Sequence, residues 1–526
     1  MSQFLNLKKN YFYYFLLIYF ISGIFLSLDV GITHDEYHSF FVGDTNKKHF
    51  LNTLFGLNYD YQPLSNLNLH YGSGFYFISA PIESIVNLFF NLDYVSLNSK
   101  KILVKHPTVF IFFVISGIYL RKIIYFITKD KNFSSLSTFL YLTYPYLLGH
   151  SFFNVKDIPF LSIWLISTFY IIKITKFFYE EKKIRNKNII ILAFLTAFLL
   201  SIRISGVLIF FEYLIFLLFV INILDLDYLK FCKLFYKKLI LFFLTIISIF
   251  YILSPAYWDN PLEVVNGIKS MSQHIQTVCT ITLGECMKAQ NLPSSYLPIW
   301  FFFKLPVIVI LGIIFLIFKE KTFFRSTHNI LFVAPIIVTT LLIILLLILF
   351  NVNLYDELRQ VMFLIPLFFI ISLSAIFLLA KKVSYFLISI FVILFVFQNI
   401  KIYPYNYIWL NNFTNFIKVN DNFELDYWGV SSKKIALIFN EKNIKSNECI
   451  ISNRNRGIED FIASKNICFL PFQSLHKKNI RPFYVALMER STKKGLPNNC
   501  DKIHSEEIQM NFSKENLVMA KIFKCN

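Results

Sequence analysis

The sequence predicts a polytopic α-helical membrane protein with about 11 transmembrane helices and a small C-terminal α/β domain. Hydrophobic residues make up 56% of the 526-residue chain, charged residues make up 16%, and the mean hydropathy is +0.56. This balance excludes a soluble globular chain. Apolar runs of about 18 to 23 residues recur along the sequence, and each can cross a hydrocarbon core of roughly 30 Å as a helix.

The basic loops set the expected orientation of these helices. The chain carries a net charge of +19, and its lysines gather in short loops between apolar runs, which is typical of cytoplasmic loops. The charge therefore does not indicate a nucleic-acid partner. We expect the N-terminus, with Lys8 and Lys9, to be cytoplasmic, together with the basic loops at residues 173–187, 230–238, 319–325 and 381–382.

The first span, residues 11–28, is followed by no small-residue cleavage site, so we expect a retained signal anchor. Residues 29–105 form a long first outer loop, in which residues 71–90, interrupted by Pro81 and Glu83, lie along the membrane surface. In the alternative, residues 71–90 span the membrane and the lysines at 100, 101 and 105 lie inside. The ten later spans are expected at residues 107–127, 133–148, 159–172, 189–201, 205–223, 239–253, 299–318, 330–350, 361–380 and 383–400.

Residues 1–400 thus form a membrane module, and residues 401–526 form a soluble domain outside it. Strand-like runs at 448–452 and 517–523 and a helix-like run at 431–440 predict an α/β unit. The tail shows no catalytic motif. Acceptor binding, a lid function and a purely structural role remain open for it.

The cysteines fit the same orientation. Cys232 falls in a cytoplasmic loop, and the other six fall outside, where an oxidising compartment allows disulfides. The short spacing of Cys279 and Cys286 predicts a local bridge, and four cysteines remain to link the tail, namely Cys449, Cys468, Cys500 and Cys525. The alternative is a set of unpaired thiols.

Three outer loops carry acids and bases at helix entrances. The first reads His34-Asp35-Glu36-Tyr37, directly after the first span, where carboxylates must face water, a cation or a substrate. The second contains Asn154, Lys156 and Asp157, and the third contains Tyr355, Asp356 and Arg359. For Lys156 and Asp157 the alternative is a helix cap and an interface anchor.

Arg203 lies between two apolar runs at an expected outer turn, where a guanidinium needs an anionic partner. A lipid phosphate suits its bidentate geometry, and an ion pair with a carboxylate is the alternative. The sequence has no Gly-rich phosphate loop, Walker lysine or HExxH motif, so a nucleotide-driven pump and a zinc protease have no support. The histidines are dispersed, so we expect no obligatory metal, although Asp35 and Glu36 could bind a divalent cation.

The ordered combination of these segments resembles the GT-C glycosyltransferases of the protein O-mannosyltransferase and aminoarabinose-transferase type, similar to glycosyltransferase family 39. The matching segments are His34-Asp35-Glu36 and Asn154-Val155-Lys156-Asp157-Ile158-Pro159-Phe160, with further similarity at residues 254–261, 354–359 and 423–429. The resemblance covers most of the membrane module, and only the ordered combination is specific.

The resemblance implies an inverting hexosyl or pentosyl transfer from a polyprenyl-phosphate carrier at the periplasmic face of a bacterial inner membrane, with the C-terminal domain periplasmic. Asp35 would be the general base, Glu36 would orient it or hold the sugar, and Asp157 would match a second acidic site. Desolvation would raise the pKa of Asp35 toward the range of a useful base. The expected phosphate ligands are Lys156, Arg203 and Arg359, and the expected substrate contacts are His34, Asn154, Tyr355 and Asp356.

The chain departs from the family in two places. The tail lacks the sugar-binding repeats of eukaryotic protein mannosyltransferases, and no clear basic-aromatic carrier segment stands near His70-Tyr71. The donor sugar and the acceptor, whether a glycan, a lipid or a protein, therefore stay open. Two other classes compete: a polymerase or ligase of surface polysaccharide, and a transporter or flippase of a lipid-linked glycan. Transporters keep charges near the bilayer midplane and show internal repeats, whereas these charges lie at one face.

Overall fold

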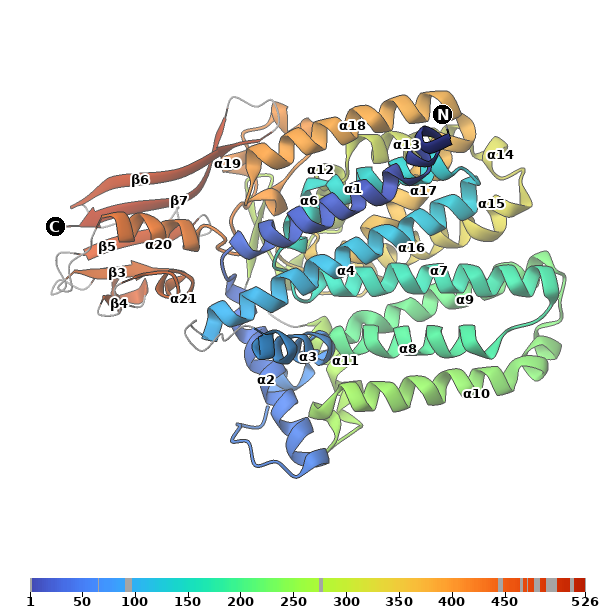
Figure 1. The fold of residues 1–526 in the computed structure, drawn as a ribbon, viewed down its shortest axis with the longest axis horizontal. Coiled ribbons are helices and arrows are strands. Elements are labelled where there is room, and N and C mark those ends of the chain that lie inside the picture. The colour runs from blue at the N-terminus through green and yellow to red at the C-terminus, as the bar shows by residue number, and fades with distance from the viewer. Residues whose placement is uncertain are drawn as a thin grey trace.

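The computed structural model shows a bundle of long helices with a small sheet domain at one end (Figure 1). We call the end of the bundle next to the sheet domain the site end. The structure describes residues 2–64, 66–89, 97–273, 278–442, 448–463, 467–470, 472–476, 483–488, 499–510 and 515–525.

Within the described residues, eight helical segments are long and apolar enough to cross a membrane, or nine if one bent pair counts as a single span. The protein is therefore a multi-pass membrane protein. α7 and α17 are buried along most of their length, whereas α10 and α18 turn apolar side chains outward, where lipid would cover them. The eight segments comprise α1 (Ser2–Asp29), α4 (Leu97–Thr128), α7 (Asp157–Glu181), η3 with α9 (Ile204–Leu208, Ile209–Ile223), α10 (Tyr228–Leu253), α15 with α16 (Thr327–Phe332, Ala334–Leu349), η6 with α17 (Arg359–Leu364, Ile365–Leu379) and α18 (Lys381–Ile402).

Three expected spans differ from the single long helices that the sequence predicts. Expected span 133–148 is α5 (Lys131–Thr143) followed by α6 (Pro145–Ser151), because Pro145 starts a new helix. Expected span 189–201 is α8 (Asn186–Ile202), which is apolar but has only 17 residues. Expected span 299–318 is α12 (Tyr296–Lys304) and α13 (Val307–Phe318), bent by 114° at Pro306, which has no N–H to continue the helix.

The expected first outer loop is largely helical. α2 (His34–Phe55) lies across the ends of the long helices in Figure 1, and Gly56, in the left-handed conformation, ends it. α3 (Gly74–Phe89) packs against α2, α4 and α8. α3 lies within residues 71–90, the segment that we expect to lie along the membrane surface. Residue 90 of that segment is outside the described residues. α11 (Glu263–Ser272) packs beside the short η1 (Asn66–His70) and closes the same end.

The C-terminal domain is the α/β unit that the sequence predicts. Its sheet has the order β4-β3-β5-β7-β6, with β3 parallel to β4 and β5, and β7 antiparallel to β5 and β6. The strands are β3 (Cys449–Ser452), β4 (Cys468–Leu470), β5 (Phe483–Met488), β6 (Cys500–Gln509) and β7 (Asn516–Cys525). The apolar face of α20 (Ser432–Glu441), with Ile435 and Phe439, packs on this sheet, and the short α21 (Asn455–Glu459) follows β3.

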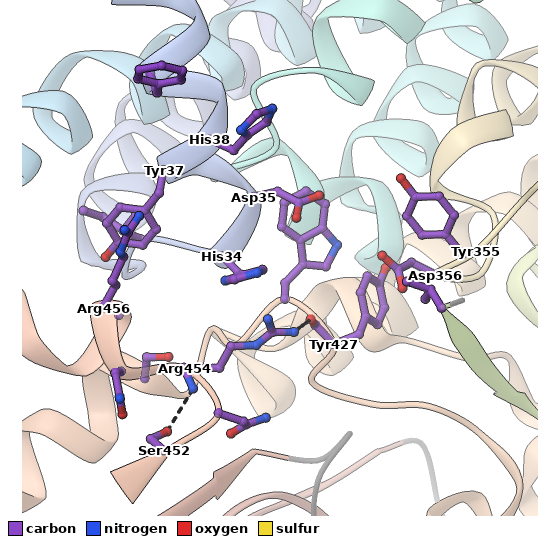
Figure 2. A pocket seen from close by; sticks show the side chains of 18 of the residues that line it. His34, Asp35, Tyr37, His38, Tyr355, Asp356, Tyr427, Ser452, Arg454 and Arg456 are labelled. Atoms are coloured by element: carbon purple, nitrogen blue, oxygen red, sulfur yellow. Dashed lines mark hydrogen bonds between the residues drawn. The ribbon is translucent and has the colours of Figure 1, made fainter. Parts of the chain in front are cut away.

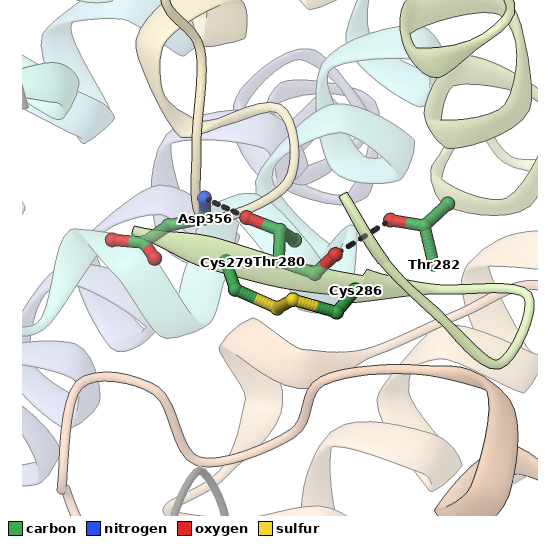
Figure 3. The surroundings of a disulfide bond; sticks show 5 residues. All are labelled: Cys279, Thr280, Thr282, Cys286 and Asp356. Atoms are coloured by element: carbon green, nitrogen blue, oxygen red, sulfur yellow. Dashed lines mark hydrogen bonds between the residues drawn. A yellow bond between two sulfur atoms is a disulfide. The ribbon is translucent and has the colours of Figure 1, made fainter. Parts of the chain in front are cut away.

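Three disulfides close local segments. The predicted bridge between Cys279 and Cys286 is confirmed, and it joins β1 (Cys279–Thr282) to β2 (Glu285–Lys288) in a two-stranded hairpin (Figure 3). The four tail cysteines also pair, as the sequence predicts. Cys449 and Cys468 join β3 to β4, and Cys500 and Cys525 join β6 to β7.

Candidate functional site

A cavity of about 1030 Å³ lies between the site end of the bundle and the C-terminal domain. Figure 2 shows α2 side chains, including His34 and Asp35, on one side, and Arg454 and Arg456 of the C-terminal domain across from them. We call this the polar cavity. It holds six of the ten side chains that the sequence singles out: His34, Asp35, Lys156, Tyr355, Asp356 and Arg359.

A second cavity of about 210 Å³ adjoins the first, because both are lined by Asp35, Lys156 and Arg359. It extends among the apolar ends of the long helices, and we call it the apolar cavity. The other four predicted residues, Glu36, Asn154, Asp157 and Arg203, border it. Its apolar lining includes Ile204, Leu208, Leu347 and Phe363. The structure therefore brings all ten predicted site residues to two adjoining cavities.

The N-terminus of α2 separates the two adjacent carboxylates. Asp35 is 42% exposed and faces the polar cavity, whereas the Glu36 side chain is fully buried. Glu36 Oε2 accepts hydrogen bonds from the Thr33 N–H (2.6 Å) and hydroxyl (2.7 Å), which caps the helix. Glu36 Oε1 lies 2.7 Å from Nε2 of His106 on α4. Glu36 thus anchors the helix turn that presents Asp35.

Arg359 stands at the centre of the charged residues. Its Nη1 lies 2.6 Å from Asp35 Oδ2, and its Nε lies 3.3 Å from Asp356 Oδ2. The guanidinium is 4.9 Å from the ring centres of both Tyr355 and Trp428, within cation–π range. Only 9% of the Arg359 side chain is exposed, so two carboxylates and two aromatic rings fix its position.

The charge balance around Asp35 differs from the expectation that desolvation raises its pKa. Burial does act in that direction, but Arg359 and Lys156 outweigh it and hold the pKa of Asp35 well below its usual range. Asp35 is therefore a fully ionised and weak base while Arg359 is paired with it.

Lys156 lies at the boundary of the two cavities. Its Nζ is 3.9 Å from the centre of the Tyr71 ring, and Tyr71 in turn contacts His38 edge-on. Burial lowers the pKa of Lys156 to about 7, with Arg203 and Arg359 adding to the effect and Asp35 opposing it. The ammonium form is thus only weakly favoured at neutral pH. Tyr71 is an aromatic partner of this lysine that the sequence did not identify.

Asp157 and Arg203 form an ion pair, which is the alternative that the sequence left open for Arg203. Asp157 is 4% exposed, and its second oxygen accepts from Asn154 Nδ2 at 2.9 Å. Arg203 keeps 23% of its side chain exposed. Asp157 therefore holds Arg203 at the edge of the apolar cavity.

A buried network behind the cavities was not predicted. Lys304 Nζ lies 2.6 Å from Glu357 Oε2, with the two side chains 0% and 1% exposed. Tyr427 OH lies 3.4 Å from both Glu357 Oε2 and His150 Nε2, and His150 Nδ1 lies 3.1 Å from Asn154 Nδ2. Burial, opposed by Lys304, raises the pKa of Glu357 to about 7. A lysine inside the apolar run 299–318 is the sequence signal that could have revealed this network.

Among the described residues, no group of three or more His, Cys, Asp or Glu side chains is placed to hold a metal ion. Asp35 and Glu36, considered above as ligands of a divalent cation, do not share an open site. Both Glu36 oxygens are already bonded, and that side chain has no exposed surface.

No protein-family model and no curated protein matches the sequence. Among solved structures, the chain is similar to ArnT from Cupriavidus metallidurans bound to undecaprenyl phosphate, with a TM-score of 0.49 and 9% identity over 98% of each chain. The apo state of the same protein gives a TM-score of 0.48 and 10% identity over 97% of each chain. The Archaeoglobus fulgidus oligosaccharyltransferase in its apo form gives 0.38 and 13%, over 92% of this chain and 70% of that one.

Proposed function

We propose that this protein is a membrane glycosyltransferase that moves a sugar from a polyprenyl-phosphate carrier to an acceptor at the outer, periplasmic face of a bacterial inner membrane. The reaction inverts the anomeric carbon, and Asp35 is the general base. The proposal rests on the ordered motifs of the sequence and on one observation of the structure. That observation is a carboxylate open to a polar cavity, with Lys156 and Arg359 beside it.

The two adjoining cavities suit the two halves of a lipid-linked sugar. A sugar and an acceptor hydroxyl need polar partners, which the polar cavity offers, and an isoprenoid tail needs apolar walls, which the apolar cavity offers. The phosphate that joins sugar and lipid would lie where the cavities meet. Lys156 and Arg359 border both cavities, and Arg203 borders the apolar one. These three cations are the phosphate ligands in this proposal.

In the transfer step, the acceptor oxygen attacks the anomeric carbon while the bond from that carbon to the phosphate oxygen breaks. The polyprenyl phosphate leaves with the electron pair of the broken bond, and the acceptor proton passes to Asp35. Negative charge grows on the leaving phosphate, so cations fixed beside it stabilise the transition state more than the ground state. Attack from the face opposite the phosphate gives inversion.

Carrier binding also changes the base in this proposal. A carrier phosphate competes with Asp35 for Arg359, and an Arg359 that turns to the phosphate no longer holds the Asp35 pKa down. Burial under the substrate then raises that pKa toward the range of an efficient base. The donor would thereby help to activate Asp35.

The experiment that tests this function uses purified full-length protein in detergent with a panel of radiolabelled polyprenyl-phosphate monosaccharides and polyprenyl-linked oligosaccharides. We expect transfer, or slow hydrolysis to water, with at least one sugar, and competition by unlabelled undecaprenyl phosphate. Turnover of oligosaccharide carriers alone would favour a polymerase or ligase instead. Binding of carriers without any turnover would favour a transporter.

A further inference from the structure

The loop between α16 and η6, residues 351–358, has an unusual backbone, and we call it the site loop. Asp356 and Glu357 have φ angles of +56° and +65°. Residues other than glycine rarely adopt this left-handed region, because the Cβ atom approaches the backbone. Two adjacent residues in that conformation persist only where surrounding contacts hold them, and such residues cluster at functional sites.

One of these contacts is the buried ion pair of Glu357 with Lys304. The pair has a 2.6 Å separation, and both side chains are essentially inaccessible to solvent. Lys304 is the last residue of α12, at the bend before α13, and its Nζ lies 3.5 Å from the carbonyl oxygen of Tyr407. The Tyr296 hydroxyl, also on α12, donates to the Glu357 carbonyl at 3.2 Å. The site loop is thus fastened to the bent helix pair.

The disulfide-closed hairpin holds the same loop from another side. The Asp356 N–H donates to Oγ1 of Thr280 at 2.9 Å (Figure 3). Thr280 is completely buried and lies in β1, next to Cys279, whose bridge to Cys286 ties the two strands together. The left-handed residues are therefore held by a side-chain ion pair on one side and by a backbone hydrogen bond on the other.

The consequence of this arrangement appears two residues further along the chain. Arg359 begins η6 directly after the site loop, and it reaches Asp35 at 2.6 Å and Asp356 at 3.3 Å. We propose that Glu357 is a positioning residue, whose buried pair with Lys304 sets the site loop so that Arg359 lies between Asp35 and Asp356. The placement of the loop stands on geometry alone, whereas its value for sugar transfer rests on the proposed function.

A general contribution to stability is the competing explanation for the pair. Buried ion pairs are often no more stabilising than apolar residues of similar size, while removal of one partner leaves an unpaired buried charge. A single Glu357→Gln variant therefore cannot separate an effect on the position of the site loop from an effect on the stability of the protein. The double variant Lys304→Met/Glu357→Gln removes both charges together and keeps the side-chain volumes similar.

The test is hydrogen–deuterium exchange, read by mass spectrometry, of the full-length protein in detergent. In the double variant we expect exchange in residues 351–362 to become at least about tenfold faster, with exchange in α7 and α4 unchanged. The matched control is Lys105→Met/Glu83→Gln, which removes a 2.7 Å ion pair between α4 and α3 and should leave residues 351–362 unchanged. Unchanged exchange there in the Lys304/Glu357 double variant would overturn the proposal. A uniform increase across all helices would also overturn it, because the pair would then act on overall stability.

A second readout uses undecaprenyl phosphate as the probe. We expect the Lys304→Met/Glu357→Gln protein to bind it about tenfold more weakly than the wild type, because Arg359 is no longer held in place. Wild-type affinity in that variant would contradict the role of the pair in placing Arg359. If the wild-type protein itself does not bind the probe, the carrier assignment fails, and the exchange experiment still decides whether Glu357 positions the loop.

Discussion

Among the single residues of the two cavities, Lys156 is a cation whose charge changes near neutral pH. Burial lowers its pKa to about 7, so its protonated fraction falls from about half at pH 7 to almost none at pH 9. A phosphate monoester is already mostly dianionic in that range. We predict that affinity for undecaprenyl phosphate falls by roughly tenfold across it, as expected for the loss of one charge contact.

The matched variant for this prediction is Lys156→Arg, because a guanidinium keeps its charge throughout the range. Its affinity for undecaprenyl phosphate should be flat between pH 7 and about 9. Binding titrations at a fixed ionic strength would provide both curves. Parallel curves for the wild type and Lys156→Arg would mean that Lys156 is not the titrating group.

Arg203 offers a prediction about geometry at constant charge. Asp157 holds one side of its guanidinium, and the rest borders the apolar cavity, so bidentate contact with a carrier phosphate is available. Arg203→Lys keeps the positive charge but cannot make the bidentate contact of a guanidinium. We predict a roughly tenfold higher KM for a polyprenyl-phosphate sugar, with kcat less affected. Unchanged kinetic constants would restrict Arg203 to its structural pair with Asp157.

Some of the site residues can be predicted from the sequence, and others cannot. Asp35, Lys156 and Arg359 could be predicted because a charged side chain at the end of an apolar run needs water, a partner of opposite charge or a substrate. The exposure of Asp35 and the burial of Glu36 could not be predicted. Which of the two side chains faces the cavity and which faces His106 depends on the residue at which α2 begins. Likewise, nothing in the sequence alone pairs Lys304 with Glu357, which lie more than fifty positions apart.

At the scale of elements, the cap of α2 is what presents Asp35. Thr33 and Glu36 bond each other across the first turn, and the bonded Glu36 oxygens are shielded from water. We predict that Thr33→Ala lowers the free energy of unfolding by about 1 kcal/mol, as for other lost caps. Denaturant titration in detergent would measure it. The control is Thr53→Ala, an exposed position near the end of the same helix, which should cost nothing.

The length of the apolar runs in the sequence predicts some of the helices and misses others. Long runs such as residues 330–350 and 361–380 became helical segments close to their expected bounds. The bend between α12 and α13 escaped prediction, because hydropathy averages over Pro306 and its missing N–H. That bend places Lys304 behind the site loop, so the least predictable element carries part of the candidate site.

For the whole molecule, the proposed function requires both cavities to face the outside of the membrane. Ser295 comes just before α12, and Ser326 comes just before α15; both are exposed. The bent helix pair α12 and α13, which counts as one possible membrane span, lies between them in the chain. We predict that a membrane-impermeant maleimide labels Ser295→Cys in intact cells, and labels Ser326→Cys only after the membrane is permeabilised. Labelling of Ser326→Cys alone in intact cells would reverse the orientation.

In the proposed function, Asp35 is the base of a sugar transfer from a polyprenyl-phosphate carrier. The most direct measurement compares sugar release from radiolabelled polyprenyl-phosphate monosaccharides by wild-type protein and by Asp35→Asn, under single-turnover conditions. We predict a rate lower by roughly 10² to 10⁴-fold in Asp35→Asn, the usual contribution of a general base, with carrier affinity largely kept. A rate in Asp35→Asn equal to that of the wild type would contradict it.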